Sequence, residues 1–192
     1  MRFEKVVLYR LEEGSEIEPK LLRLELLGAL FIVLLGSALH FTFDWSNKLW
    51  LVGIFSAVNE STWEHLKLAV IPALLWMLIE MKILKERPGN FFLAKAVGIY
   101  STPILIIVIF YSYKAVLGKN LLFLDISTFV IAVVIGQLIS YKTMFLGKLP
   151  EIYDRIALFF LILLLFAFFI FTFYPPHIFL FQDPITLRYG IV

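Results

Sequence analysis

Residues 40–67 read HFTFDWSNKLWLVGIFSAVNESTWEHLK and connect two long hydrophobic runs of the chain. Two of the three histidines, His40 and His65, fall within this connection together with several acidic residues. The runs on either side are long enough to cross a lipid bilayer, which takes about 20 predominantly apolar residues for a helix. The connection therefore predicts a chain of membrane-spanning helices, with polar chemistry concentrated between the first two of them.

The composition of the whole chain agrees with a membrane protein. Of the 192 residues, 61% are hydrophobic and 17% are aromatic, and the mean hydropathy is +0.91, well above that of an ordinary soluble domain. The predicted fold class is all-α, a polytopic integral membrane helix bundle embedded in the lipid bilayer. The lack of cysteine excludes disulfides, thiolate nucleophiles and cysteine-ligated metal sites. A formal charge of only +2 argues against a nucleic-acid partner.

Hydrophobic runs separated by short loops divide the chain into three parts. We predict a cytoplasmic N-terminal tail at residues 1–20, a transmembrane helical bundle at residues 21–174 and an extracytoplasmic C-terminal tail at residues 175–192. Residues 49–58 are apolar but too short to span, which indicates an interfacial or re-entrant segment. Five transmembrane spans are expected, at residues 21–43, 61–84, 91–117, 121–141 and 155–174.

Spacing within the spans predicts which faces point into the bundle. Residues three or four positions apart lie on one face of a helix, and small residues on such a face mark close packing of a neighbouring helix. The first span has this pattern at Gly28, Ile32, Gly36, His40 and Asp44, and the fourth has it at Asp125, Thr128, Ala132, Gly136 and Ser140. The fifth span lacks such a face, so we expect it to face lipid most broadly. At the start of the second span, Ser61-Thr62-Trp63-Glu64 matches a capping box.

The positive charges favour one orientation in the membrane. With the N-terminus in the cytoplasm, 12 of the 17 lysines and arginines lie on the cytoplasmic side and 5 lie outside, as the positive-inside rule requires. We therefore predict a multi-pass protein of the cell membrane with its C-terminus outside. All three histidines then share the extracytoplasmic side. Glu25 and Glu80 are expected to be solvated or paired charges at the cytoplasmic interface.

The histidines and carboxylates on the extracytoplasmic side indicate a metal site. Imidazole and carboxylate groups suit a divalent metal such as zinc. The candidate ligands are His40, His65, His177 and Asp44, with Glu60 as an alternative to His65. Glu64 is the candidate general base for a metal-bound water. Glu64 and His65 point about 100° apart on a helix, so both can face one centre only if the first turn is irregular.

Other interpretations of the same side chains stay open. In one, an outer polar cavity binds or transports a small solute or a cation through Asp44, Glu60, Asp125 and Asp183. In another, each residue has a structural role: Glu64 completes the capping box, and Asp183 with Pro184 forms a turn.

Four sequence blocks resemble a known family. They are GSALHFTFDW, FSAVNESTWEHLKL, LDISTFVIAVVIGQLISY and FYPPHIFLFQDPITLRYG. They are similar to the blocks of a family of small prokaryotic multi-pass membrane proteins of unknown function, and the similarity covers residues 26–190. The resemblance implies a multi-span membrane protein and assigns no activity and no catalytic residue.

Three functional hypotheses follow from the sequence. The first is binding or transport of a small solute or cation in the extracytoplasmic cavity. The second is metal-dependent hydrolysis of a lipid-like substrate within the membrane, and the third is a structural or accessory role as a membrane subunit. The sequence alone does not decide whether the protein is an enzyme.

Overall fold

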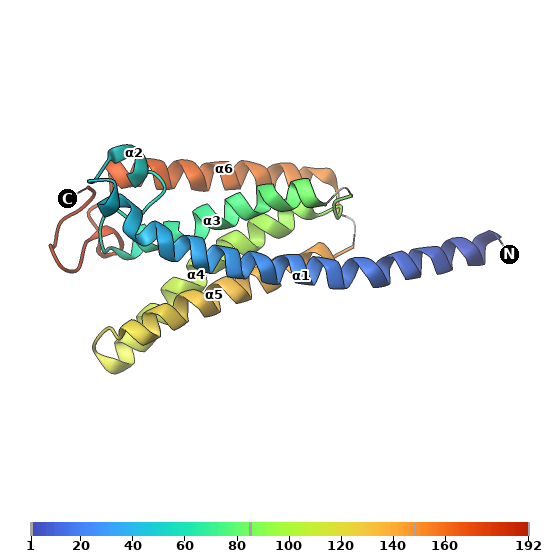
Figure 1. The fold of residues 1–192 in the computed structure, drawn as a ribbon, viewed down its shortest axis with the longest axis horizontal. Helices are drawn as coiled ribbons and strands as arrows, with labels where there is room; N and C mark the ends of the chain where they lie inside the picture. The colour runs from blue at the N-terminus through green and yellow to red at the C-terminus, as the bar shows by residue number, and fades with distance from the viewer. Residues whose placement is uncertain (1, 85, 148, 192) are drawn as a thin grey trace.

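The computed structural model describes the backbone of residues 2–84, 86–147 and 149–191, and the side chains of these residues from residue 18 onward. The described residues form helices and connecting loops, with one isolated bridge between Gln182 and Tyr189 (Figure 1). In chain order the helices are α1 (Arg2–Trp45), α2 (Trp50–Gly53), α3 (Thr62–Ile83), α4 (Phe91–Leu117), α5 (Leu122–Met144), α6 (Glu151–Phe173) and the 3-10 helix η1 (Phe179–Phe181).

Four of these helices are long and apolar enough to cross a membrane. They comprise residues Glu18–Trp45 of α1, together with α4, α5 and α6. The predicted all-α membrane bundle is therefore confirmed. The fifth long helix, α3, has 22 residues and packs against α1 and α4, but Glu64, Lys67 and Glu80 make it less apolar than the other four.

Two segments are helical where the sequence prediction gave no helix bounds. α1 begins at Arg2, so the backbone of residues 2–20, predicted as a tail, continues the helix of the first span. At about 1.5 Å per residue, its 44 residues extend well past the other helices (Figure 1). The apolar segment 49–58 contains a single helical turn, α2, followed by a loop whose residues Ser56, Ala57 and Val58 are buried.

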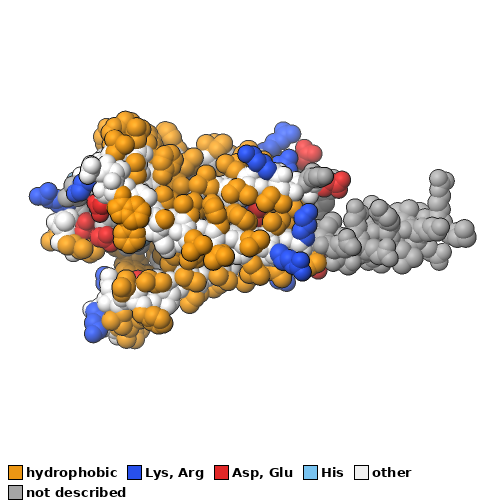
Figure 2. Space-filling model, viewed as in Figure 1, with side chains coloured by type: hydrophobic (Ala, Val, Ile, Leu, Met, Phe, Trp, Pro, Cys, Tyr) orange, Lys and Arg blue, Asp and Glu red, His pale blue; other side chains and the backbone are white. Residues whose placement is uncertain are grey.

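The helices run roughly along one axis, so the bundle has two distinct ends (Figure 1). The tail end holds Trp45, α2, the start of α3 and residues 174–191, and the α4–α5 turn points the same way. The opposite end holds the α3–α4 and α5–α6 connections. Figure 2 shows hydrophobic side chains over the middle of the described surface and lysine and arginine side chains towards both ends, as expected of a membrane-embedded bundle.

Small residues bring the helices close together, as the spacing pattern predicted. Gly36 of α1 lies against the backbone of Leu68 in α3, and Gly98 of α4 lies against Gly136 of α5. The small face of α5 is buried at Thr128, Ala132 and Ser140. A side chain at either glycine would push the backbones apart, so these contacts position α1, α3, α4 and α5. Of the four apolar spans, α6 has the smallest buried share, in agreement with its predicted lipid exposure.

Candidate functional site

The N-terminus of α3 is organised by Ser61. Its side-chain oxygen accepts a hydrogen bond from the backbone N–H of Glu64 at 3.4 Å, which confirms half of the predicted capping box. The reciprocal half is wrong, because the backbone N–H of Ser61 donates to the side chain of Asn59 at 2.8 Å. Glu64 instead accepts a hydrogen bond from the backbone N–H of Val58.

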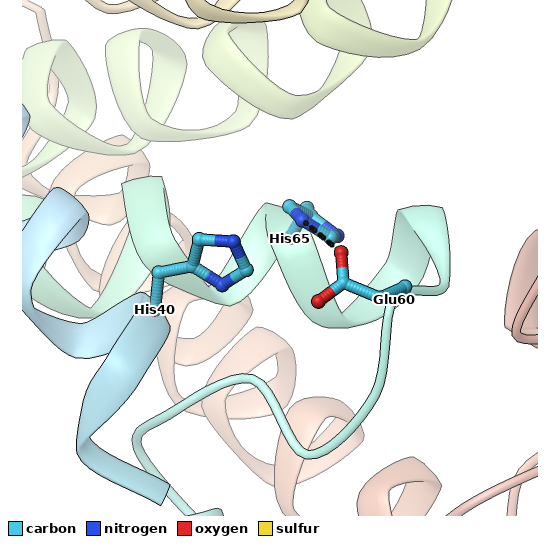
Figure 3. Close-up of side chains that lie close together, drawn as sticks. All are labelled: His40, Glu60 and His65. Atoms are coloured by element: carbon cyan, nitrogen blue, oxygen red, sulfur yellow. Dashed lines mark ion pairs between the residues drawn. The ribbon is translucent and has the colours of Figure 1, made fainter. Parts of the chain in front are cut away.

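His65 is held in a defined orientation one turn into α3. Its Nδ1 lies 2.9 Å from the carbonyl oxygen of Ser61, and because a carbonyl only accepts hydrogen bonds, this nitrogen carries the proton. Its Nε2 faces a carboxylate oxygen of Glu60 at 3.5 Å (Figure 3). This tautomer of His65 therefore presents a lone pair towards an anion, an arrangement that a bound cation would stabilise.

His40 joins this pair from α1. Its ring centroid lies 5.1 Å from that of His65, and Figure 3 shows its ring beside Glu60 and His65. Among the described residues, Nδ1 of His40 is buried without a hydrogen-bond partner. One potential ligand atom from each of His40, Glu60 and His65 lies within 4.8 Å of the other two. We call these three residues the histidine cluster.

The C-terminal residues tie down the loop that carries Glu60. The side-chain amide of Asn59 donates a hydrogen bond to the backbone carbonyl of Gly190 at 2.8 Å. The backbone N–H of Glu60 donates to the carboxylate of Asp183 at 3.4 Å, and the N–H of Ile185 donates to the same carboxylate at 2.7 Å. The tail thus holds Asn59 and the backbone N–H of Glu60.

The remaining predicted site residues lie apart from the histidine cluster. The ring of His177 stacks on Tyr189 with their centroids 4.5 Å apart, and Asp44 is exposed at the end of α1. Asp125 accepts a hydrogen bond from the hydroxyl of Tyr113, within the α4–α5 hairpin. Within the part of the chain that the structure describes, the group able to hold a metal contains neither His177 nor Asp44.

The comparison with protein families covers nearly the whole chain. The model of DUF6512, a family of unknown function, matches residues 16–191. The chain belongs to the DUF6512 family. No curated protein and no solved structure matches this DUF6512 chain significantly.

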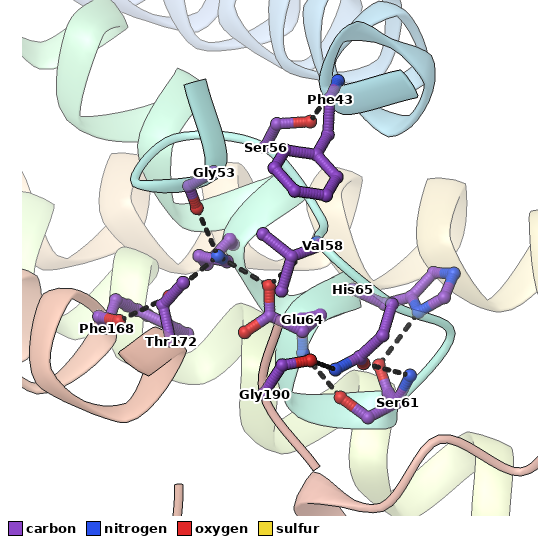
Figure 4. A network of polar contacts seen from close by, with 12 residues as sticks. Phe43, Gly53, Ser56, Val58, Ser61, Glu64, His65, Phe168, Thr172 and Gly190 are labelled. Carbon is purple, nitrogen blue, oxygen red and sulfur yellow. Dashed lines mark hydrogen bonds and ion pairs between the residues drawn. The ribbon is translucent and has the colours of Figure 1, made fainter. Parts of the chain in front are cut away.

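The DUF6512 chain also contains a buried ion pair beside the histidine cluster, between Lys67 and Glu64. The role of Lys67 in this pair was not predicted from the sequence. The ammonium group of Lys67 pairs with Glu64 and donates hydrogen bonds of 2.8 Å to the carbonyl of Gly53 and to the hydroxyl of Thr172. Figure 4 shows Glu64 on the side facing Gly53 and Thr172, while the ring of His65 points away. Because Glu64 is paired with Lys67, it faces away from the histidine cluster.

A second buried group lies near the opposite end of this DUF6512 protein. Lys95 of α4 pairs with Glu25 of α1 at 2.7 Å and with Glu80 of α3, and at most 2% of each of these side chains is exposed. Glu25 and Glu80 were expected to be solvated or paired charges at the interface; they are paired, but they are buried within the bundle. Partners on three different helices leave no trace in local sequence spacing. We call these residues the Glu25–Glu80–Lys95 triad.

The carboxylate of Asp183 gives the docked tail a pH dependence. Burial raises the pKa of Asp183, but hydrogen bonds from the backbone N–H groups of Thr186, Ile185 and Glu60 together hold it below its ordinary value. Ionised Asp183 therefore stabilises the docked tail at every pH above the unfolded value of about 3.9. This contribution is lost as the pH falls through the lower pKa of the folded state.

We therefore expect the tail to detach on acidification but not around neutrality. Hydrogen exchange at the amides of Ile185 and Thr186, corrected for intrinsic rates, should show protection at pH 6 that begins to fall near pH 4 and is lost as the pH falls through the lower pKa of folded Asp183. In Asp183→Ala, these amides should exchange rapidly throughout this pH range. Equal protection throughout this pH range in the wild type would contradict the role assigned to Asp183.

Proposed function

We propose that the protein binds a divalent transition-metal cation, with zinc as the best fit, at the histidine cluster. The observation that carries this proposal is the convergence of ligand atoms from His40, Glu60 and His65 within 4.8 Å. The three residues come from α1, from the loop before α3 and from α3 itself, so only the folded bundle brings them together. Two imidazoles and one carboxylate form a ligand set typical of zinc.

The geometry of the histidine cluster is close to that of a zinc site. Zinc bonds of 2.0–2.1 Å in tetrahedral arrangement place neighbouring ligand atoms about 3.3 Å apart. The separation of 3.5 Å between Nε2 of His65 and the carboxylate of Glu60 is already near this value. Rotation of the His40 side chain, whose Nδ1 is buried without a partner, would bring in the third ligand and satisfy that nitrogen.

The hydrogen bonds around the cluster support a metal-binding role. Ligating histidines usually donate their other ring N–H to a carbonyl or carboxylate, which fixes the tautomer and raises ligand basicity. His65 makes this bond to the carbonyl of Ser61. The tail bonds at Asn59 and Glu60 restrict the loop, so less conformational entropy is lost when Glu60 binds a cation.

We propose that this site faces the extracytoplasmic solution. The excess of basic residues in the loops of the opposite end supports an orientation with the tail end outside. A cation would then reach the cluster from outside the cell, either to be held there or to be passed into the bundle.

Binding fits the geometry better than hydrolysis does. A zinc hydrolase needs a base beside the metal-bound water, and Glu64, the base predicted from the sequence, is engaged by Lys67 and by the backbone N–H of Val58. The histidine cluster supplies metal ligands, whereas the carboxylate of Glu64 is already bound by Lys67 and Val58 in a structural role.

Metal content and zinc-dependent stability test the proposal. Purified protein should bind zinc stoichiometrically after chelator treatment and reloading. Free zinc at a hundredfold excess over the Kd should stabilise it by about 2.7 kcal/mol. His40→Ala and His65→Ala remove ligands and should abolish both effects.

The matched control is His177→Ala, which removes a histidine of the same tail end that stacks on Tyr189. It should keep wild-type zinc content and stabilisation. Equal zinc binding by His40→Ala, His65→Ala and the wild type would overturn the proposal.

A further inference from the structure

The Glu25–Glu80–Lys95 triad places two carboxylates against one ammonium group inside the bundle. One carboxylate oxygen of Glu25 lies 2.7 Å from the ammonium nitrogen of Lys95, and Glu80 contacts the same nitrogen. Glu25 and Glu80 are each 1% exposed and Lys95 is 2% exposed. With both carboxylates ionised, two negative charges and one positive charge leave the triad with a net charge of −1.

A net charge at this depth is costly, and the neighbouring groups do not neutralise it. Burying an uncompensated charge costs several kcal/mol. The side chains that face the triad from α3 and α5 are the neutral donors Trp76, which bonds to Glu80, Ser140, which bonds to the side chain of Glu25, and Gln137, which bonds to the Glu25 carbonyl. Within the part of the chain that the structure describes, the ion pairs of the triad join only its own three members.

Two carboxylate oxygens of the triad accept no hydrogen bond from the described residues, Oε2 of Glu80, which is in ion-pair contact with Lys95, and Oε2 of Glu25. The Oε2 oxygen of Glu25 is buried and accepts no hydrogen bond from any described residue, whereas its Oε1 oxygen accepts from both Lys95 and Ser140. An ionised carboxylate in an apolar interior normally accepts hydrogen bonds at both oxygens. The free oxygen therefore marks a place where one further positive charge fits.

We propose that the Glu25–Glu80–Lys95 triad is a proton-binding site, in which the two carboxyl groups share one proton and the triad is electrically neutral. A proton needs only one free carboxylate oxygen. A metal cation such as Na⁺ or Ca²⁺ needs several oxygen ligands. The Oε1 oxygens of both glutamates already accept hydrogen bonds, and Oε2 of Glu80 is in ion-pair contact with the ammonium group of Lys95. The proton belongs to the coupled pair and not to either glutamate alone.

The Glu64–Lys67 pair is a natural control within the same chain. It is also buried, with side chains that are 3% and 0% exposed, but it matches one carboxylate with one ammonium group. Its net charge is zero without an added proton. Both sites therefore share burial and chemistry, and only the triad has an excess negative charge.

The triad is independent of the histidine cluster. Fifteen residues of α1 separate Glu25 from His40, which is a rise of about 22 Å along a helix. Glu80 lies in the last turn of α3, and Lys95 lies about one turn from the start of α4. The proton-binding site is therefore close to the opposite end of the bundle, and its test does not depend on metal binding.

Infrared spectroscopy of the purified protein in lipid tests this proposal directly. A protonated carboxylic acid has a C=O stretching band separate from carboxylate and amide bands, and this band shifts in D₂O. The wild type should show such a band at neutral pH, where a glutamate in water, with a pKa of about 4.3, is ionised. Glu25→Gln and Glu80→Gln should each remove it, since either change leaves one carboxylate for one ammonium group.

Two further variants complete the experiment. Glu64→Gln should leave the band unchanged, and Lys95→Met should increase its intensity, because both carboxyl groups then need a proton. Because Glu25→Gln and Glu80→Gln are both expected to remove the band, either variant can supply the test if the other fails to fold. A neutral-pH spectrum without a band that depends on Glu25 or Glu80 would overturn the proposal. A band that is lost on adding Na⁺ would also overturn it, by showing that a metal cation occupies the site.

Discussion

Replacing Lys67 with methionine is expected to lower the free energy of unfolding by about 3–5 kcal/mol, the cost of leaving a partner charge buried without its counter-ion. The side chain of Lys67 is fully buried, and its ammonium group joins Glu64, Gly53 and Thr172. The substitution therefore leaves the carboxylate of Glu64 without its counter-ion and removes the hydrogen bond to the carbonyl of Gly53, the last residue of α2. Circular dichroism during a denaturant titration in detergent micelles measures the loss.

A double variant separates the stranded charge from lost packing. In Lys67→Met with Glu64→Gln no charge remains, and the glutamine oxygen can still accept from the backbone N–H of Val58. We expect this variant to be more stable than Lys67→Met alone. Lys119→Met, a change at an exposed lysine, should stay within about 0.5 kcal/mol of the wild type. A Lys67→Met protein as stable as this control would refute the structural role of the pair.

Gly98→Val is expected to be the second severe substitution, because it forces α4 away from α5. A Cβ at Gly98 would lie 2.6 Å from the carbonyl oxygen of Gly136 and 2.8 Å from the Cβ of Ser140. The first neighbour is backbone, so relief requires movement of a whole helix, and overpacking of this kind costs about 1–3 kcal/mol or more. The thermal unfolding temperature in micelles should fall accordingly.

The same substitution in open space supplies the control. Nothing lies within 4 Å of a Cβ added at Gly147, in the connection between α5 and α6, so Gly147→Val should unfold close to the wild-type temperature. If Gly98→Val unfolds at the same temperature as Gly147→Val, the close contact between α4 and α5 at Gly98 is disproved.

The helical spans could be predicted from hydrophobic length, and the small-residue faces from their spacing. Residues 91–117 were predicted as a span and form α4 with the same ends. The burial of Thr128 and Ser140 followed from the four-residue repeat. The charged groups of the bundle could not be placed in this way, because Lys67 and Lys95 find partners on other helices, and a single sequence does not show which helices are neighbours.

The candidate site was predicted only in part. The angle between adjacent residues on a helix predicted that Glu64 and His65 would face different directions, and the structure confirms this. The structure groups Glu60 with His40 and His65, a possibility that the sequence left open. His177 lies in a non-helical part of the tail, where periodicity gives no direction for a side chain, and Asp44 is exposed in the last turn of α1.

The attachment of the tail to the Glu60 loop has a consequence for biosynthesis. The contact between Asn59 and Gly190 joins residues 131 positions apart, and that between Glu60 and Asp183 joins residues 123 apart. At about 5–20 residues per second, a ribosome takes on the order of ten seconds to make the intervening chain. Four long helices, α3, α4, α5 and α6, are synthesised during that interval, so the hydrogen bonds that restrict the Glu60 loop form only after all four have been made.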